Sequence, residues 1–340
     1  MKSLSLLVKP ASGLCNMKCD YCFYREEMSQ MKGFHQEIMS DAIMELLIQR
    51  ACESADDYLQ FTFQGGEPTL AGPDFYRRFT DRVKKIKKRR LQVSYSFQTN
   101  GILLDENWLS FFRENQVLVG LSFDGTAELH DRYRRNAKGG RTAGQVLAAW
   151  DLLQKEGIAA NLLCVVTKQA ARKPERVYRF MRKMGAEHLQ FIPCMDFREA
   201  CSVKQDLSPS AADYAYFLKG VFDLWYQEWT SGYYVSVRQF DDYICALSGR
   251  SPSTCSACGE CGAYLVVEND GSVYPCDFYV EAERRLGNIA DFSLEALRKG
   301  EKMKAFLSES AKGSRCKKCR FYRLCKGGCR HDYISVDISG

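Results

Sequence analysis

The run GLCNMKCDYCFY, residues 13–24, contains three closely spaced cysteines, Cys15, Cys19 and Cys22. Three thiolates at this spacing can hold three irons of a four-iron cubane, which leaves the fourth iron open for chemistry. An iron–sulfur cluster that only carries electrons is usually closed by four thiolates. The run therefore predicts a cluster that binds another molecule. The alternatives are a zinc knuckle that lacks one ligand and three unrelated buried thiols, because such spacings also occur by accident.

The composition predicts a soluble protein with a substantial core. At 340 residues the chain is long enough for one large domain or two of ordinary size. No stretch approaches the roughly eighteen apolar residues of a membrane span. The short apolar stretch Leu4–Val8 runs directly into Lys9-Pro10, which makes a poor signal peptide. We therefore expect a cytoplasmic protein that does not interact with membranes.

Most of the sixteen cysteines are clustered, and in a reducing compartment clustered thiols are more often metal ligands than disulfide partners. Eleven of them fall into three groups. The first is the opening run, the second is Cys255, Cys258, Cys261 and Cys276, and the third is Cys316, Cys319, Cys325 and Cys329. The five scattered cysteines are interpreted as small buried apolar residues: Cys52, Cys164, Cys194, Cys201 and Cys245.

The net charge of +6 is modest and does not by itself require nucleic acid as a partner. The densest basic run, RVKKIKKRR at 82–90, falls at the end of a predicted helix, where basic residues complement the helix dipole. It lacks the interleaved aromatic residues that stack on bases. We therefore predict no nucleic-acid partner.

Apolar runs with strand character alternate with helical stretches along the first two thirds of the chain. The predicted strands are Leu4–Val8, Leu59–Phe63, Val93–Phe97, Val117–Phe123, Ala160–Val166 and His188–Ile192. The predicted helices are Gln36–Ser54, Pro73–Lys88, Asp105–Glu114, Thr142–Glu156, Pro174–Met184 and Ser210–Trp229, with start signals such as Ser40, Pro73 and Pro174. This alternation predicts a parallel sheet covered by helices, either doubly wound or an open barrel.

Polar and glycine residues follow consecutive predicted strands. The cysteine run follows the first strand, Gln64–Pro68 the second and Gln98–Gly101 the third. Ser122–Gly125 closes the fourth strand, and Arg134 is expected in the long loop beyond it. Ordinary turn chemistry could explain any one of these segments. Because ligands bind beyond the carboxyl ends of parallel strands, their recurrence predicts a binding site at this edge.

From about residue 238 the pattern changes to short strands, many turns and dense cysteine, and we place a domain boundary between 232 and 240. Tyr264–Glu268 and Ser272–Pro275 flank Asn269-Asp270-Gly271, which is a strong hairpin signal. A helix over Ser293–Leu307 separates the two later cysteine groups. Since this part has few apolar residues, we expect it to need metal in order to fold.

Long runs of the sequence resemble the anaerobic sulfatase-maturating enzymes, which are radical S-adenosylmethionine (SAM) enzymes with a SPASM extension. The runs are residues 5–24, 61–72 (FTFQGGEPTLAG), 97–101 (FQTNG), 119–125 (VGLSFDG), 223–226, 266–280 (VVENDGSVYPCDFYV), 285–289 and 319–330 (CRFYRLCKGGCR). The resemblance implies a partial (β/α)6 TIM-type barrel over residues 1–235, the radical SAM core. It also implies a cysteine-rich SPASM iron–sulfur domain over residues 236–340.

The resemblance also implies a cofactor site. Cys15, Cys19 and Cys22 would bind the catalytic [4Fe-4S] cluster, whose open iron takes the amino and carboxylate groups of SAM. Gly66 and Glu67 would line the methionine amino group, because a glycine pair allows close approach and a carboxylate can accept from an ammonium group. Further cofactor-binding residues would be Tyr21, Gln98, Asn100, Ser122, Arg134 and Met195. The family more often has leucine at the position of Met195, a change of little chemical weight.

By the same resemblance, the 5′-deoxyadenosyl radical would abstract a hydrogen atom from Cβ of a cysteine or serine in an unfolded sulfatase polypeptide. The product would be formylglycine. Asp277, directly after Cys276, matches the family's base, which takes the proton from sulfur or oxygen while a second electron leaves. The alternative interpretation of Asp277 is an exposed turn aspartate.

The family pattern assigns Cys255, Cys261, Cys276 and Cys329 to a first auxiliary [4Fe-4S] cluster. A second cluster would take Cys316, Cys319 and Cys325 with one cysteine farther on, but no cysteine follows Cys329 here. Either the chain is truncated at Gly340 or this cluster has an open or substituted site. Cys258 is an extra thiol, which we interpret as a spare and not as a replacement ligand.

Two other functions are alternatives. One is a related SPASM enzyme that modifies a ribosomally made peptide, for example by a thioether crosslink, and the other is a protein that uses its clusters only for electron transfer or scaffolding. A pure electron carrier has no use for QGGEP beside a three-cysteine site. Flavodoxin or ferredoxin is the expected electron partner, since the basic chain would attract acidic proteins. The sequence leaves open the target sulfatase, its cysteine or serine type, and the oligomeric state.

Overall fold

The computed structural model describes residues 1–24, 37–195, 207–309, 316 and 318–335 of the chain. Its centre is a ten-stranded sheet in the order β10-β9-β8-β1-β2-β3-β4-β5-β6-β7. The strands are β1 (Ser3–Lys9), β2 (Tyr58–Phe63), β3 (Gln92–Thr99), β4 (Leu118–Ser122), β5 (Ala160–Val166), β6 (His188–Pro193), β7 (Ser236–Val237), β8 (Leu265–Glu268), β9 (Ser272–Tyr274) and β10 (Gly287–Asn288).

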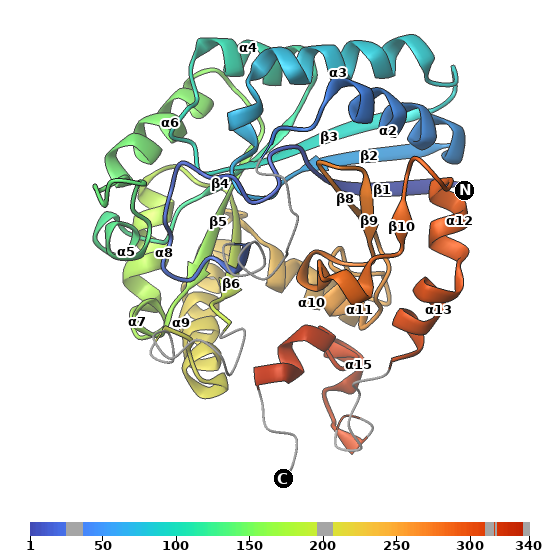
Figure 1. Ribbon diagram of the computed structural model, residues 1–340. Helices are drawn as coiled ribbons and strands as arrows, with labels where there is room; N and C mark the ends of the chain where they lie inside the picture. Colours follow the sequence, from blue (N-terminus) through green and yellow to red (C-terminus); the bar gives the residue numbers. More distant parts are fainter. Residues whose placement is uncertain (25–36, 196–206, 310–315, 317, 336–340) are drawn as a thin grey trace.

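Strands β1 to β7 are all parallel to their neighbours, and helices cover the outer side of the curved sheet (Figure 1). These helices are α2 (Asp41–Ser54), η1 (Pro68–Ala71), α3 (Pro73–Ile86), α4 (Glu106–Glu114), α5 (Ala127–Tyr133), α6 (Ala143–Lys155), α7 (Lys168–Ala171), α8 (Pro174–Lys183) and α9 (Ala211–Thr230). The six predicted βα units are therefore present, and the fold is the predicted partial barrel.

The layer between sheet and helices is rich in aromatic residues. Residues that face the helices alternate along β2, where Leu59, Phe61 and Phe63 are buried. Phe63 meets Tyr76 of α3 edge to face, with ring centroids 4.9 Å apart, and β3 adds Phe97 to the same cluster. Burial of each such ring removes about 150–250 Å² from water, so this layer fixes the register of the central strands.

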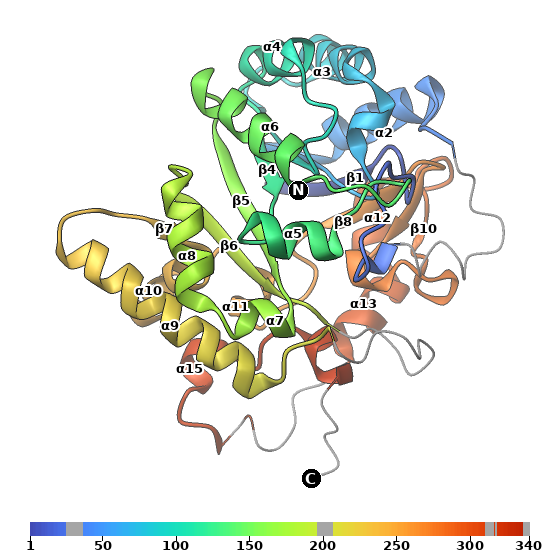
Figure 2. The same ribbon diagram turned by 90° about the vertical axis from the view of Figure 1, so that its left-hand side faces the viewer.

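The C-terminal part continues the same sheet. β8 lies parallel to β1, with Leu6 opposite Leu265 and Lys9 opposite Glu268, and β9 returns antiparallel through the predicted hairpin. The remaining elements are α10 (Arg238–Leu247), α11 (Cys255–Cys258), η2 (Asp277–Tyr279), η3 (Ala282–Arg284), α12 (Leu294–Lys299), α13 (Glu301–Ser308), α15 (Tyr322–Cys325) and η4 (Arg330–Ser335). Figure 2 shows β8 beside β1, while α10 contacts β6 and β7 at the other end of the sheet and α15 contacts α10.

Several predicted boundaries change in the structure. α2 begins at Asp41, because the Ser40 side chain accepts the Ile43 N–H at 3.3 Å; the predicted start, Gln36, lies outside the described residues. The helix predicted over Ser293–Leu307 is two helices, α12 and α13, since Gly300 adopts an extended conformation between them. After proline, glycine has the lowest helix propensity of the common residues, so the helix breaks at Gly300.

The C-terminal part is richer in core contacts than we expected. Its residues Leu265, Val273, Leu297 and Phe306 belong to the same buried cluster as the barrel residues. Hydrophobic burial against β1 and α2 therefore contributes to its folding, whatever metal adds. The division at residue 235 stays a prediction.

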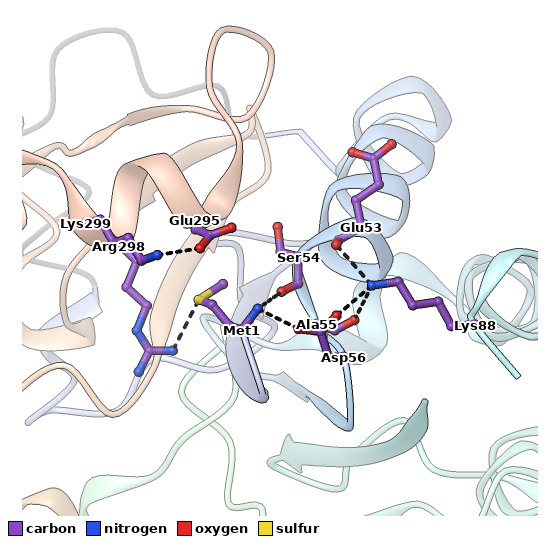
Figure 3. Close-up of polar contacts among 9 residues, drawn as sticks. All are labelled: Met1, Glu53, Ser54, Ala55, Asp56, Lys88, Glu295, Arg298 and Lys299. Carbon is purple, nitrogen blue, oxygen red and sulfur yellow. Dashed lines mark hydrogen bonds and ion pairs between the residues drawn. The ribbon is translucent and has the colours of Figure 1, made fainter. Parts of the chain in front are cut away.

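The first residue joins the two parts of the molecule (Figure 3). The Met1 amino group donates to the Ser54 carbonyl at 2.7 Å and pairs with Asp56 at 3.1 Å, while its sulfur accepts from Arg298 of α12 at 3.9 Å. Lys88 pairs with the same Asp56 from the end of α3. Among the described residues, no helix has the length and apolar character needed to cross a membrane.

Candidate functional site

The cysteine loop, residues 10–24, follows the carboxyl end of β1 and is held from two sides. On one side the backbone N–H groups of Gly66 and Glu67 donate to the carbonyls of Ser12 (2.6 Å) and Leu14 (2.7 Å). A Cβ on Gly66 would lie 2.1 Å from the Leu14 oxygen, so only glycine permits this contact. The loop is thus packed directly on the QGGEP segment.

On the other side the cysteine loop bonds to the segment after α5. The Lys18 and Asp20 N–H groups donate to the carbonyls of Arg135 (2.7 Å) and Tyr133 (3.0 Å). With both sides fixed, the three thiols are carried on a backbone whose position is set by β2 and by residues 133–137.

The thiols of this loop have surroundings suited to an iron–sulfur cluster. Cys19 is 9% exposed, and Cys15 and Cys22 are half-buried. The Met17 N–H donates to the Cys15 sulfur at 3.4 Å, and Asn100 approaches the same sulfur at 3.9 Å. Burial raises the pKa of the Cys15 and Cys19 thiols to about 12, and for Cys19 the Arg134 charge opposes that rise. Bound iron would displace the thiol protons, and these donors would then face thiolates.

Glu67 is buried behind the loop and is 1% exposed. Its Oε1 accepts from the Thr69 N–H (3.0 Å), the Thr69 hydroxyl (2.6 Å) and the Thr99 hydroxyl (2.7 Å), and its Oε2 accepts from the Asn100 N–H (2.7 Å). Burial raises the pKa of this carboxyl, and the Asn100 N–H is the largest opposing effect. The carboxylate therefore ties the end of β2 to the end of β3, and its predicted cofactor contact stays a prediction.

The predicted residues on β3 and β4 also come together at this edge. The Gln98 amide donates to the Ser122 hydroxyl at 2.8 Å, and Asn100 donates to the side chain of Asn16 at 2.8 Å. Met195 is half-buried just beyond β6. The ends of β2, β3 and β4 therefore bring polar side chains to the edge of the sheet that carries the cysteine loop, as expected for a site at the carboxyl ends of parallel strands.

Arg134 lies beyond β4, as predicted, but the expected loop contains the short helix α5, and Arg134 is the extended residue directly after it. Its Nε pairs with Asp124 Oδ2 at 3.2 Å, and the Tyr21 hydroxyl donates to the same oxygen. The other oxygen of Asp124 accepts the Val165 N–H at 3.1 Å. Asp124 thus joins two predicted cofactor residues, Tyr21 and Arg134, although in the sequence it is only one residue of the strand end Ser122–Gly125.

His130 lies behind Asp124 and is completely buried. Its Nδ1 accepts the Asp124 N–H at 3.4 Å, and its Nε2 is 3.1 Å from the Thr142 hydroxyl. Burial lowers the pKa of His130 from 6.5 to about 4; Asp124 and Asp131 oppose this shift, and Arg134 adds to it.

We expect this histidine to make the fold sensitive to mild acid. Between pH 6.5 and 4 the unfolded chain binds a proton that folded His130 does not, so its stabilising contribution is complete above pH 6.5 and is lost as the pH falls toward 4. Lowering the pH from 7 to 5.5 should cost about 1 kcal/mol at this site. Thermal unfolding of the wild type and of H130Q at both pH values measures it. If the wild type and H130Q lose the same stability between these two pH values, His130 does not cause the acid sensitivity.

Asp277 is buried beside the cysteine loop, which rules out the exposed turn aspartate. Its Oδ2 accepts from the Tyr24 hydroxyl (2.5 Å) and from the Gln64 amide (3.2 Å), and its Oδ1 pairs with the Lys9 ammonium (2.9 Å). Lys9 also pairs with Glu268 at 3.1 Å. Lys9 and Tyr24 were not predicted as site residues, and Gln64 was predicted only as part of the strand-end segment Gln64–Pro68, although each stands inside a run that carries the family resemblance.

The thiols predicted for the first auxiliary cluster influence one another. The pKa of Cys255 is raised by burial and by the nearby Cys261 and Cys258, and that of Cys329, at about 11, by burial, Asp332 and then Cys255. Burial raises the pKa of Cys276 to about 12, with a smaller effect from Cys329. The effects link Cys255 with Cys261 and Cys329, and Cys276 with Cys329. That the four thiols hold one cluster stays a prediction.

Within the described part of the chain, no three cysteine, histidine or acidic side chains converge on a single point. A cubane differs from a single ion because each thiolate binds a different iron. Cys258 lies beside Cys255, with its sulfur 3.4 Å from the Pro252 carbonyl. Cys316 and Cys319 precede α15, where the Cys319 N–H donates to the Cys316 carbonyl at 3.1 Å, and Cys325 is the last residue of that helix. The ligand sets stay predictions.

Two family models match the chain. One, described as the radical SAM superfamily, matches residues 10–181, and the other, described as an iron–sulfur cluster-binding domain, matches residues 258–320. The first spans the cysteine loop and the four barrel strands β2 to β5, and the second spans most of the later cysteines.

Relatives named as anaerobic sulfatase-maturating enzymes match over nearly the whole chain. A cysteine-type anaerobic sulfatase-maturating enzyme of Clostridium perfringens (strain 13 / Type A) is 42% identical over 97% of this chain and 90% of its own length. A serine-type enzyme of Bacteroides thetaiotaomicron is 32% identical over 100% of this chain and 85% of its own. The solved structure of native anSMEcpe with bound AdoMet and Kp18Cys peptide superposes with a TM-score of 0.90, at 42% identity, over 97% of this chain and 90% of that one.

Proposed function

This chain belongs to the anaerobic sulfatase-maturating enzymes, radical SAM enzymes that carry an iron–sulfur SPASM extension, and we propose that it oxidises a cysteine in a sulfatase active-site motif to formylglycine. The substrate would be an unfolded sulfatase polypeptide. The higher identity to cysteine-type than to serine-type relatives supports cysteine as the target residue.

One observation carries the proposal: the Asp277 carboxylate is joined directly to the cysteine loop. Tyr24, two residues after Cys22, donates to Asp277 at 2.5 Å, and Asp277 itself follows Cys276. A carboxylate is thereby held between the residues proposed for the catalytic cluster and those proposed for the first auxiliary cluster. Oxidation of a thiol carbon to an aldehyde needs a base at such a position.

The chain's own residues account for the proton and for the geometry. When bound, a catalytic cluster on Cys15, Cys19 and Cys22 together with SAM would supply the radical that removes one hydrogen atom from the substrate Cβ, and a first auxiliary cluster would supply the acceptor for the second electron. The substrate S–H proton then passes to the Asp277 carboxylate as the carbon–sulfur double bond forms. Water hydrolyses the resulting thioaldehyde to the aldehyde and hydrogen sulfide, so the substrate loses two electrons overall.

The residues present fit these groups. Cys15, Cys19 and Cys22 would hold the catalytic cluster. The residues proposed to surround SAM are Tyr21, Gly66, Glu67, Gln98, Asn100, Ser122, Arg134 and Met195. Cys255, Cys261, Cys276 and Cys329 would hold the first auxiliary cluster, and Cys316, Cys319 and Cys325 would supply three ligands of a second one. A small acidic electron carrier, flavodoxin or ferredoxin, is the proposed electron partner.

We expect a Cys-x-Pro-x-Arg peptide to be converted to the aldehyde at least about tenfold faster than its serine form, a difference of about 1.4 kcal/mol in the barrier. The protein would be reconstituted anaerobically with iron, sulfide, dithionite and SAM. The aldehyde is trapped with a hydrazine reagent, and 5′-deoxyadenosine is measured in the same sample.

An alanine form of the same peptide is the matched control and should give no aldehyde. Release of 5′-deoxyadenosine without aldehyde from either reactive peptide would contradict the substrate assignment. It would leave the radical SAM chemistry intact and would favour another peptide modification.

A further inference from the structure

Lys9, the last residue of β1, is buried at the centre of the proposed site and is 2% exposed. Lysine is almost never fully buried unless it is paired. Here the Lys9 ammonium is 3.1 Å from Glu268 Oε1 and 2.9 Å from Asp277 Oδ1. Both carboxylates come from the C-terminal part of the chain, so this cation joins β1 to the segment that carries Cys276.

The surrounding backbone is shaped to admit the lysine. A Cβ on Gly65 would lie 3.1 Å from both Cβ and Cγ of Lys9, closer than ordinary side-chain contacts, so the glycine leaves room for the lysine stem. The ammonium also lies 4.6 Å from the centre of the Tyr24 ring, which attracts it. It is thus enclosed by two carboxylates and one aromatic face.

The two oxygens of Asp277 are held by different groups. Lys9 holds Oδ1, while Tyr24 and Gln64, both attached to the cysteine-loop side of the site, donate to Oδ2. A carboxylate fixed at both oxygens cannot rotate about its own axis. Removal of Lys9 would leave Asp277 and Glu268 as two buried like charges that repel each other.

We infer that Lys9 is a positioning residue for the oxidation: it fixes the Asp277 carboxylate in the orientation that receives the substrate proton. This inference rests on the proposed function, in which Asp277 is the base. The opposing explanation is that Lys9 only balances the charge of the two buried carboxylates. The two explanations differ in what they predict when the charge is balanced without the lysine.

The K9M/E268Q double variant distinguishes the positioning role of Lys9 from charge balance alone. It removes one positive and one negative charge, so the net charge of the Lys9, Glu268 and Asp277 group is unchanged while Oδ1 loses its ion pair. We expect the double variant to keep its iron content and to release 5′-deoxyadenosine with peptide, while the aldehyde formed per 5′-deoxyadenosine falls at least about tenfold. K9M alone should show the same fall in aldehyde formed per 5′-deoxyadenosine.

The matched control is K299M/E295Q, which removes an exposed pair of the same two residue types, 2.6 Å apart on α12, and should leave the ratio unchanged. If K9M/E268Q forms aldehyde per 5′-deoxyadenosine within about twofold of the wild-type ratio, the inference is wrong and Lys9 only balances charge. If K9M does not fold, the double variant alone decides. If the wild type itself releases 5′-deoxyadenosine without aldehyde, the proposed function fails, and the inference fails with it.

Discussion

Replacing Asp277 by asparagine is expected to lower aldehyde formation by about 10² to 10⁴-fold, the usual contribution of a general base, while 5′-deoxyadenosine release continues. Asparagine keeps the size of the side chain and an oxygen that can accept from Tyr24, but it cannot take a proton from the substrate. The substrate radical would then form and return to starting material or to other products. Hydrazine trapping of the aldehyde and chromatography of 5′-deoxyadenosine measure the two yields in one sample.

The control for this variant is D291N, an exposed aspartate in the same C-terminal part. It should convert peptide at the wild-type rate. Iron content must be measured for both variants, because Asp277 follows the proposed ligand Cys276. Aldehyde formation at the wild-type rate by D277N would show that another group is the base. Parallel loss of iron and of both products would instead indicate damage to a cluster.

The barrel was predictable because its elements are encoded locally. Each strand is a short apolar run, each long helix has an apolar face and start signals such as Ser40 or Pro73, and their alternation specifies a parallel sheet. The short helices α5 and α7 were missed because they have only one or two turns and so give little periodic signal. The break at Gly300 depends on one residue inside an otherwise helical pattern.

The joining of the two parts of the sheet could not be predicted from the pattern. The run 265–268 predicts a hairpin strand, but nothing local says that it pairs with residues 6–9, more than 250 positions away. The ion pairs of Lys9 depend entirely on that pairing, since Lys9 lies opposite Glu268 in the register. In the sequence Lys9 is only the polar residue that ends a strand.

The same reasoning explains why the candidate site was found in part. Clustered cysteines and glycines are conspicuous in a sequence because few environments outside functional sites need several of them close together. Asp124 does not stand out, although it joins Tyr21 of the cysteine loop, Arg134 after α5 and the backbone of β5. Its importance comes from three partners on three separate segments, which only the folded chain brings together.

The G66A variant should disable the catalytic site without changing any residue that reacts. The added Cβ would lie 2.1 Å from the Leu14 oxygen and 2.6 Å from the Gly13 carbonyl carbon, and both are backbone atoms that can move only with the cysteine loop. The hydrogen bonds from Gly66 to Ser12 and from Glu67 to Leu14 would break. Since a displacement of about 1 Å in a reacting group can cost about 10²-fold in rate, we expect at least that loss of 5′-deoxyadenosine release.

Gly144, at the start of α6, is the matched control, because an added Cβ there meets nothing within 4 Å. G144A should keep full activity, with stability equal to wild type or higher by up to about 1 kcal/mol. The change that SAM causes in the EPR signal of the reduced protein should be lost in G66A and kept in G144A. A normal signal and normal 5′-deoxyadenosine release in G66A would mean that the cysteine loop can shift and still bind SAM productively. The close packing of that loop on the QGGEP segment would then serve stability alone.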